Sequence, residues 1–359
     1  MLRKLLGYII PNRREPTVKQ NSGADQNRLR MIVVGCGRGR SHARALLAQP
    51  DRFELVGLVD LDAKRIKEAL RSLDLPDRLA YTSYPEALKK SKCDGVIIAT
   101  WARTHDRLVQ TAIESDKHIM VEKPFTLELA PAQRLTTMAE ARDLKIVVTQ
   151  QWRYMPGQRT VRRLMTDSAY GGAQTGHLLS YKARGGEYPD SDHSQLWQMT
   201  VHEIDSLIAM VNRPVVEVYG HSFRPPKTTW HRESTATAEL TFDNGARFAL
   251  VSTSDARVNS CEFRAECEEG SIVLRNSRSF GGTETLLIGT EQKDSLCPSK
   301  IDSGLTEDQL DQHVHTTFDE WIKGGPEPET SARNNLVVLA TLNAIIESGT
   351  TGRRVQVIV

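Results

Sequence analysis

Three parts of the sequence contain groups that could take part in chemistry. Residues 31–42 (MIVVGCGRGRSH) combine an apolar run with three glycines, and Asp60 ends a second apolar run. Lys123 follows a third apolar run, where its ammonium could stabilise negative charge developing on an oxygen atom. His202 lies in a stretch with helical periodicity, and an imidazole can accept a proton near neutral pH. The surrounding pattern predicts the elements that must position these groups.

The glycine-rich stretch is interpreted as a dinucleotide-binding turn. Residues 31–34 predict a buried strand, and apolar residues recur at helical spacing from Ala43, so the glycines lie between a strand and a helix. Glycine lets such a turn bend tightly and approach a pyrophosphate, which the free N–H groups at the helix start then face. Asp60 could accept hydrogen bonds from both ribose hydroxyls of an adenosine. The candidate cofactor-binding residues here are Gly35, Gly37, Gly39, Arg40 and Asp60.

This turn departs from the usual Gly-x-Gly-x-x-Gly spacing. Arg40 stands where the third glycine is expected, and Gly39 comes one position early, which predicts a turn one residue short. A glycine cluster alone could also be only a turn. The strand before it, the helix after it and the acid at the right distance favour the dinucleotide site.

Composition limits the class of protein. The chain has 359 residues, enough for two domains with full cores, and 39% apolar and 26% charged residues, as in globular proteins. A net charge of +2 gives no indication of a nucleic-acid or anionic-membrane partner, and no apolar run approaches the roughly 20 residues of a membrane span. The five cysteines have no metal-ligand spacing, so we expect reduced thiols, a cytoplasmic location and no metal.

The order of predicted elements divides the chain into two domains. Residues 1–30 are expected to be a polar, mobile extension, with a signal-peptide start or a short surface-lying helix as alternatives. Strands and helices alternate over residues 31–150, which predicts a parallel sheet with helices on both faces. Residues 151–359 predict an α+β domain, with a helix over 196–211, a strand over 262–267 and a hairpin at Asp243-Asn244-Gly245. Helices are predicted over about 306–323 and 333–347 and a strand over 354–359, with the last helix and strand packing back on the first domain.

Motifs spread over this whole range carry a family resemblance. They are the glycine turn ending in His42, Val59-Asp60, Ile98-Ala99-Thr100 with His105, residues 117–124 (KHIMVEKP), residues 201–205 (VHEID) and residues 347–355 (ESGTTGRRV). From Met31 to Val359 the chain resembles the glucose–fructose oxidoreductase and inositol dehydrogenase family (Gfo/Idh/MocA). The resemblance implies a Rossmann-type doubly wound parallel sheet that binds NAD, followed by an α+β domain with a large, open, mostly antiparallel sheet. One face of that sheet would cover the nicotinamide, and the other would form a homodimer or homotetramer.

The resemblance also implies roles for individual residues. Lys123 would point at the nicotinamide and hydrogen-bond the reacting hydroxyl, with Glu122 beside the cofactor. His202 would be the catalytic histidine. From the residues alone, a lysine after a strand is usually a solvated charge. Likewise Gln198, His202 and Asp205, at i, i+4 and i+7, form a polar stripe that is usually the solvated face of a helix.

Some positions depart from the family pattern or leave alternatives open. Many members have an aspartate four residues before the histidine, whereas this chain has Gln198, which can orient a hydroxyl but cannot take a proton. Trp101 stands where relatives often carry proline, and could wall the nicotinamide pocket or be a packed aromatic. Arg153 could bind a polyol or carboxylate, or form an interdomain salt bridge. The further cofactor-binding candidates are Thr100, Trp101, His105, Glu122 and Lys123; the substrate candidates are Arg153, Tyr154, Gln198 and Asp205.

Together these observations predict an NAD(H)-dependent oxidoreductase. It would transfer a hydride between the nicotinamide and a hydroxyl carbon of a sugar, sugar derivative or cyclitol, with NAD favoured over NADP because Asp60 repels a 2′-phosphate. The partner is then a small carbohydrate or polyol, and no nucleic acid. Two alternatives remain: a glycosidase that uses NAD for a transient oxidation, and a non-catalytic dinucleotide sensor of the same fold.

Overall fold

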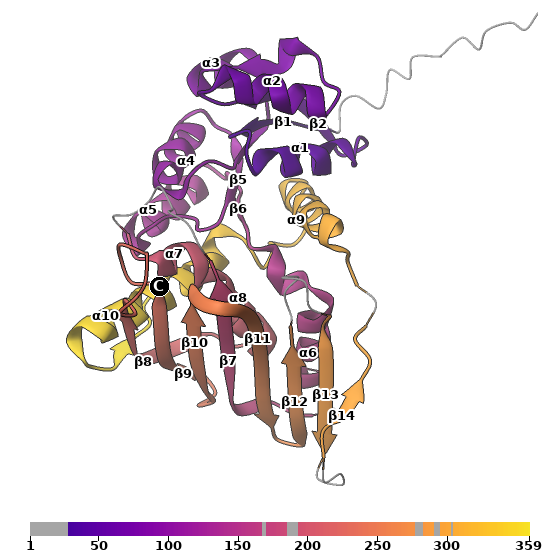
Figure 1. The fold of residues 1–359 in the computed structure, drawn as a ribbon. Coiled ribbons are helices and arrows are strands. Elements are labelled where there is room, and N and C mark those ends of the chain that lie inside the picture. The colour runs from indigo at the N-terminus through magenta and orange to yellow at the C-terminus, as the bar shows by residue number, and fades with distance from the viewer. Residues whose placement is uncertain (1–27, 167–169, 185–192, 277–282, 291–294, 303) are drawn as a thin grey trace, which may run out of the picture.

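The first sheet forms because its strands are almost entirely apolar and buried on both faces. The structure, a computed structural model, describes residues 28–166, 170–184, 193–276, 283–290, 295–302 and 304–359 (Figure 1). All neighbouring strands of the first sheet pair in parallel, in the order β3-β2-β1-β4-β5-β6. The strands are β1 (Leu29–Val34), β2 (Phe53–Val59), β3 (Ala80–Tyr81), β4 (Gly95–Ile98), β5 (His118–Glu122) and β6 (Ile146–Thr149).

Helices connect these strands, and two of them start at a side-chain cap. The side chain of Asp62 accepts a hydrogen bond at the start of α2, and Ser83 does the same at the start of α3. The order of strands reverses between β1 and β4, which is where doubly wound sheets bind ligands at the carboxyl ends of their strands. The helices are α1 (Gly39–Leu47), α2 (Ala63–Ser72), α3 (Tyr84–Lys90), α4 (His105–Glu114) and α5 (Leu129–Glu140).

The second sheet is a long, open sheet below the first (Figure 1). Its nine strands follow the order β14-β13-β12-β11-β7-β10-β9-β8-β15, and in the described part β7 and β10 pair in parallel while the other neighbours pair antiparallel. The strands are β7 (Ala173–Ala183), β8 (Val215–Phe223), β9 (Thr235–Phe242), β10 (Arg247–Thr253), β11 (Asp255–Cys267), β12 (Gly270–Arg275), β13 (Thr285–Thr290), β14 (Cys297–Ser299) and β15 (Val355–Gln356). The fold class expected from the sequence is confirmed.

One helix, α6 (Pro156–Thr166), lies between the two sheets in the chain, and α7 (Gln195–Met199) and α8 (Val201–Val211) lie between strands β7 and β8 of the second sheet. Two more helices, α9 (Glu307–Ile322) and α10 (Ala332–Thr351), follow the last long strands. Helix α9 packs against α1 of the first sheet, and Figure 1 shows it beside that helix although it comes near the end of the chain. Helix α10 contacts α5 and α8, and Ser331 just before it bridges to Val147 of β6. The C-terminal part of the chain therefore holds both sheets together.

Several predicted boundaries differ from the structure. The predicted helix over 196–211 is interrupted at Thr200, the strand at 262–267 is the end of the longer β11, and the last strand covers two residues. That last strand, β15, pairs with β8 of the second sheet, so it does not pack on the first as predicted. The DNG hairpin joins β9 and β10 as predicted. Residues 1–27 of the expected extension lie outside the described residues, and the domain boundaries near residues 30 and 150 stay predictions.

Candidate active site

The glycine turn has the geometry of a phosphate-binding turn despite its unusual spacing. Gly35 has a φ of +97°, and a Cβ there would lie 2.5 Å from the carbonyl oxygen of Ala99. A Cβ on Gly39 would lie 2.7 Å from Val33 Cγ1, so Gly39 allows the close helix–strand approach that the third glycine normally provides. A Cβ on Gly37 would meet nothing within 4 Å, which leaves the space beside the turn open. The turn thus fits a dinucleotide, and Arg40 is an exposed residue of α1.

Asp60 lies at the end of β2 beside this turn. Its carboxylate accepts hydrogen bonds from the backbone N–H of Cys36 (2.8 Å) and of Asp62 (3.0 Å). These two bonds orient the carboxylate toward the glycine turn before any ligand arrives. This arrangement agrees with the ribose-binding role that the sequence predicts, which stays a prediction.

Glu122 at the end of β5 is occupied by protein partners. Its Oε1 accepts hydrogen bonds from Arg38 Nε (2.8 Å) and lies 2.9 Å from His42 Nε2, and the side chain is buried. Burial alone would raise the pKa of Glu122, but His42 and Arg38 outweigh it and hold that pKa well below its usual range. Glu122 therefore anchors the glycine turn through Arg38 and His42, and its place beside the cofactor stays a prediction.

Helix α9 extends this anchor from the other end of the chain. Arg38 Nη2 donates to Asp311 Oδ1 at 2.7 Å, and His42 Nδ1 lies 3.0 Å from His315 Nε2. Burial and the neighbouring His42 lower the pKa of His315 well below its usual value, which favours the neutral form of this ring. The sequence pattern did not connect α9 with the glycine turn, because the two are more than two hundred residues apart.

Lys123 reaches across to the second part of the chain. Its Nζ donates to the carbonyl oxygen of Gln198 at 2.9 Å, although the two residues are 75 positions apart. Gln198 is the fourth residue of α7, and His202 is the second residue of α8. The side chain of Lys123 is half-buried, so it is not the solvated charge that a lone lysine after a strand usually is.

His202 is held by an aromatic residue that the sequence did not single out. Its side chain is 3% exposed, and its ring stacks on Trp152 with 3.7 Å between ring centroids and 18° between planes. Gln198 and Asp205 are also buried, so the stripe they form with His202 is not a solvated helix face. The only signal for Trp152 was its place beside Arg153 in the stretch after the last parallel strand.

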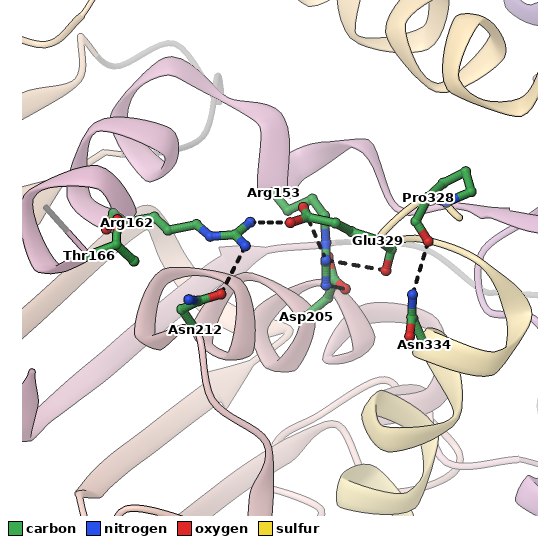
Figure 2. A network of polar contacts seen from close by, with 8 residues as sticks. All are labelled: Arg153, Arg162, Thr166, Asp205, Asn212, Pro328, Glu329 and Asn334. Carbon is green, nitrogen blue, oxygen red and sulfur yellow. Dashed lines mark hydrogen bonds and ion pairs between the residues drawn. The ribbon is translucent and has the colours of Figure 1, made fainter. Parts of the chain in front are cut away.

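Arg153 and Asp205, both substrate candidates, bind each other. Arg153 donates from Nη2 and Nε to the two Asp205 oxygens, at 2.5 and 3.1 Å, and from Nη1 to the carbonyl oxygen of Glu329. The Glu329 carboxylate and Asn212 in turn accept hydrogen bonds from Arg162, and Figure 2 shows this network running from the short helix η3 (Gln151–Tyr154) and α6 across α8. Burial would lower the pKa of Arg153, but Asp205 outweighs it and keeps the pKa above its usual value. The structure favours the salt-bridge alternative over direct substrate binding by Arg153 and Asp205.

Tyr154 packs against helix α9. Its ring packs edge-on against His313 of α9, with 4.5 Å between centroids, and burial raises the pKa of its hydroxyl to about 12. This is a correction to its expected role in the substrate site, because η3 turns successive side chains in different directions. Trp152, two residues earlier, takes the position next to His202.

The remaining cofactor candidates lie near the end of β4. Thr100 Oγ1 is 2.7 Å from Thr104 Oγ1, and Trp101 is 46% exposed, so it is not a packed core aromatic. His105 is 0% exposed, with Nδ1 2.8 Å from the carbonyl oxygen of Pro124 and Nε2 3.3 Å from that of Thr100. This corrects the expectation of a direct cofactor contact for His105, which ties the ends of β4 and β5 together.

A second lysine near His202 was missed by the sequence analysis. Lys182 of β7 is 1% exposed, and its Nζ donates to the carbonyl oxygen of Met199 (2.7 Å) and to Glu203 Oε2 (3.0 Å). In the sequence, Lys182 could have been noticed as a single charged residue at an inward-facing position of an alternating strand.

In the described part of the chain, no group of three or more His, Cys, Asp or Glu side chains is placed to hold a metal ion. Nor does that part contain a helix long and apolar enough to cross a membrane.

Comparison with known proteins agrees with this architecture. A family model described as an oxidoreductase family with an NAD-binding Rossmann fold matches residues 29–150, and the model of the GFO/IDH/MocA C-terminal domain matches residues 159–273. D-apiose dehydrogenase from Paraburkholderia graminis is 25% identical over 362 residues, which cover 95% of this chain and 90% of that protein. Myo-inositol 2-dehydrogenase from Thermotoga maritima is 24% identical over 324 residues, covering 87% of this chain and 93% of that protein.

Solved structures share the fold over nearly the whole chain. The aldose-aldose oxidoreductase from Caulobacter crescentus, complexed with glycerol, superposes with a TM-score of 0.81 at 17% identity, covering 92% of this chain and 100% of that one. The WlbA dehydrogenase from Bordetella pertussis, in complex with NADH and UDP-GlcNAcA, gives a TM-score of 0.77 at 19% identity, covering 93% and 100%. The chain therefore belongs to the Gfo/Idh/MocA family of oxidoreductases, and its N-terminal part is an NAD-binding Rossmann fold.

Proposed function

We propose that this protein is a dehydrogenase that acts on a CH–OH group of a sugar, sugar derivative or cyclitol with NAD. The observation that carries the proposal is the hydrogen bond from Lys123 Nζ to the Gln198 carbonyl, four residues before His202. It brings an ammonium from the end of the parallel sheet and an imidazole from α8 to the same region. The names of the relatives, a D-apiose dehydrogenase and a myo-inositol 2-dehydrogenase, support the carbohydrate class of substrate.

The glycine turn and Asp60 are the residues that would hold the cofactor. The backbone at Gly35 and Gly37 would face the pyrophosphate, and Asp60, already oriented by the Cys36 N–H, would accept from the adenosine ribose. When bound, NAD supplies the hydride acceptor for the oxidation. Trp101, exposed just after β4, would wall the nicotinamide side of this site.

Lys123 and His202 would divide the work on the hydroxyl group. The Lys123 ammonium would hydrogen-bond the substrate oxygen and stabilise the negative charge that develops there as the C–H bond breaks. His202 would accept the hydroxyl proton, and stacking on Trp152 fixes the plane of its ring. Gln198 can orient a hydroxyl but cannot take a proton, so the proton stays on His202 or passes from it to water.

The decisive experiment screens sugars, sugar acids and cyclitols with NAD and NADP, and nicotinamide absorbance is the readout. Substrate-dependent NADH formation that falls by about two to four orders of magnitude in Lys123→Ala supports the proposal. Tight NAD binding without NADH formation from any compound would overturn it. Release of a free sugar from a glycoside would then favour the redox-cycling glycosidase, and no reaction at all would favour the sensor.

The free face of the second sheet is proposed as the contact between copies. Large side chains on strands of this sheet, Tyr181, Tyr219 and Phe223, are exposed, and Tyr181 points away from its buried neighbour Lys182. A homodimer or homotetramer formed there would cover them. Light scattering after size-exclusion chromatography measures the mass directly, and a monomer would contradict this part of the proposal.

The free thiols of all five cysteines support the predicted cytoplasmic location.

A further inference from the structure

The helix that carries His202 is anchored by a completely buried ion pair. Lys182 on β7 and Glu203 on α8 are 1% and 0% exposed, and Glu203 also accepts a hydrogen bond from Ser180 Oγ at 2.9 Å. Ser180 and Lys182 are two residues apart on one strand, so both side chains project from the same face of the sheet. That face lies against the first turn of α8, where Glu203 directly follows His202.

The same lysine also holds the junction between α7 and α8. The helix is interrupted at Thr200, and the carbonyl groups of the two preceding residues each accept a hydrogen bond from a lysine ammonium. Lys123 from the first sheet binds the Gln198 carbonyl at 2.9 Å, and Lys182 from the second sheet binds the Met199 carbonyl at 2.7 Å. Thr200 itself hydrogen-bonds Ser252 of β10 at 3.0 Å. The junction is therefore fixed from both sheets.

A buried ion pair is a weak way to gain stability. Taking both charges out of water costs several kcal/mol per ion, and a hydrophobic pair of similar volume is often as stable or more stable. The pair does provide directional contacts: Lys182 donates to two acceptors, one before and one after the break in the helix. Directional contacts of this kind can specify one position of a short helical turn where apolar packing would allow several.

We propose that Lys182 is a positioning residue for His202. By binding the Met199 carbonyl and the Glu203 carboxylate, it fixes the first turn of α8 and keeps the imidazole of His202 stacked on Trp152. This inference rests on the proposed function, in which His202 accepts the substrate proton. Lys182 is itself fully buried, and it acts through the backbone and Glu203.

The test compares Lys182→Met with the wild-type protein. Methionine fills the space of the lysine stem but lacks the charge and the donors. The first measurement is the NMR signal of the His202 ring C–H in protein labelled at histidine Cε1, assigned by its absence in His202→Ala. In the wild type the stacked Trp152 ring displaces this signal from the usual histidine position, and in Lys182→Met we expect most of that displacement to be lost. The second is kcat, which should fall about 10- to 100-fold because a misplacement near 1 Å is enough for such a loss.

Asp319→Asn is the matched control. Asp319 is also fully buried and paired with two cations, Arg52 and Lys323, but it lies on α9, away from α8. This variant should lose stability while keeping the His202 signal and kcat. NAD affinity should stay at the wild-type value in Lys182→Met, because the glycine turn is untouched.

Each outcome decides the proposal. The proposal is overturned if the His202 signal in Lys182→Met stays at its wild-type position. It is also overturned if that signal moves while kcat does not change. If Lys182→Met does not fold, Glu203→Gln is the second variant: it keeps the shape but removes the charge and one of the two acceptor oxygens. It should shift the His202 signal in the same direction by less, and an unchanged signal then overturns the proposal. The NMR signal needs no substrate, so a wild-type protein without turnover would refute the proposed function separately, while the signal still shows whether Lys182 positions His202.

Discussion

Replacement of Arg153 by methionine tests whether this arginine serves structure or substrate. The change removes the bidentate contact with Asp205 and the hydrogen bond to the Glu329 carbonyl, and leaves the Asp205 carboxylate buried without its cation. Removing one partner of a buried ion pair costs about 3–5 kcal/mol of unfolding free energy. We expect Arg153→Met to lose stability within this range, because both partners are almost completely enclosed.

Arg30 provides a matched control for this loss. It binds Asp94 with the same bidentate geometry, at 3.0 and 2.7 Å, but the two side chains are 41% and 32% exposed. Solvent screens such a pair, so Arg30→Met should cost only about 0–1 kcal/mol. The double variant Arg153→Met/Asp205→Leu removes both buried charges and should recover most of the loss seen in Arg153→Met.

The loss in Arg153→Met should also depend on pH. Burial raises the pKa of the Asp205 carboxyl, and Arg153 works against this rise. Without Arg153 the folded-state pKa rises further above the unfolded-state value, so the folded variant binds this proton more tightly than the unfolded chain does. The variant is therefore relatively stabilised at low pH, and that contribution is lost as pH rises toward the folded-state pKa. The stability difference from wild type should be larger at pH 8 than at pH 5.

Urea unfolding followed by tryptophan fluorescence at both pH values measures these differences. NAD affinity and, once a substrate is known, KM complete the comparison. If Arg153→Met were no less stable than Arg30→Met and its main defect were a raised KM, the arginine would belong to the substrate site and the structural reasoning would be wrong.

Four further predictions concern the chemistry. Asp60 should make NAD bind more tightly than NADP, and equal affinities in a fluorescence titration would contradict this. Lys123→Ala should retain NAD affinity while losing about two to four orders of magnitude in turnover; near-normal turnover would remove Lys123 from the mechanism. Alcohol oxidation should rise with pH through one ionisation in the range where histidine titrates, and His202→Ala should abolish that rise and lower the rate about 10²–10⁴-fold. Gln198→Asp should keep activity, because it adds a second proton acceptor next to His202, and loss of all activity would count against this role.

The parallel sheet and the glycine turn were predictable because their causes are local. Short apolar runs separated by helical periodicity determine buried parallel strands. Gly35 is needed because its positive φ is combined with an approach to the Ala99 carbonyl that leaves no room for a Cβ. The role of Gly39 was less predictable from its irregular spacing. Only the structure showed that a Cβ at this position would collide with Val33, so that Gly39 lets α1 approach the sheet. The motifs near Lys123 and His202 are also local, and the catalytic roles that they predict for these two residues stay predictions.

The partners of the polar residues were decided only by tertiary structure. Periodicity placed Gln198, His202 and Asp205 on one stripe and suggested a solvated face, but α8 is enclosed by α6, α10, η3 and β7. Buried polar groups must find partners, and the partners came from distant parts of the chain: Arg153 for Asp205 and Trp152 for His202. A sequence shows which residues can make an ion pair or a stack, whereas which ones meet depends on how elements tens of residues apart pack. For the same physical reason, the buried Lys182–Glu203 pair beside His202 became visible only when β7 and α8 were in contact.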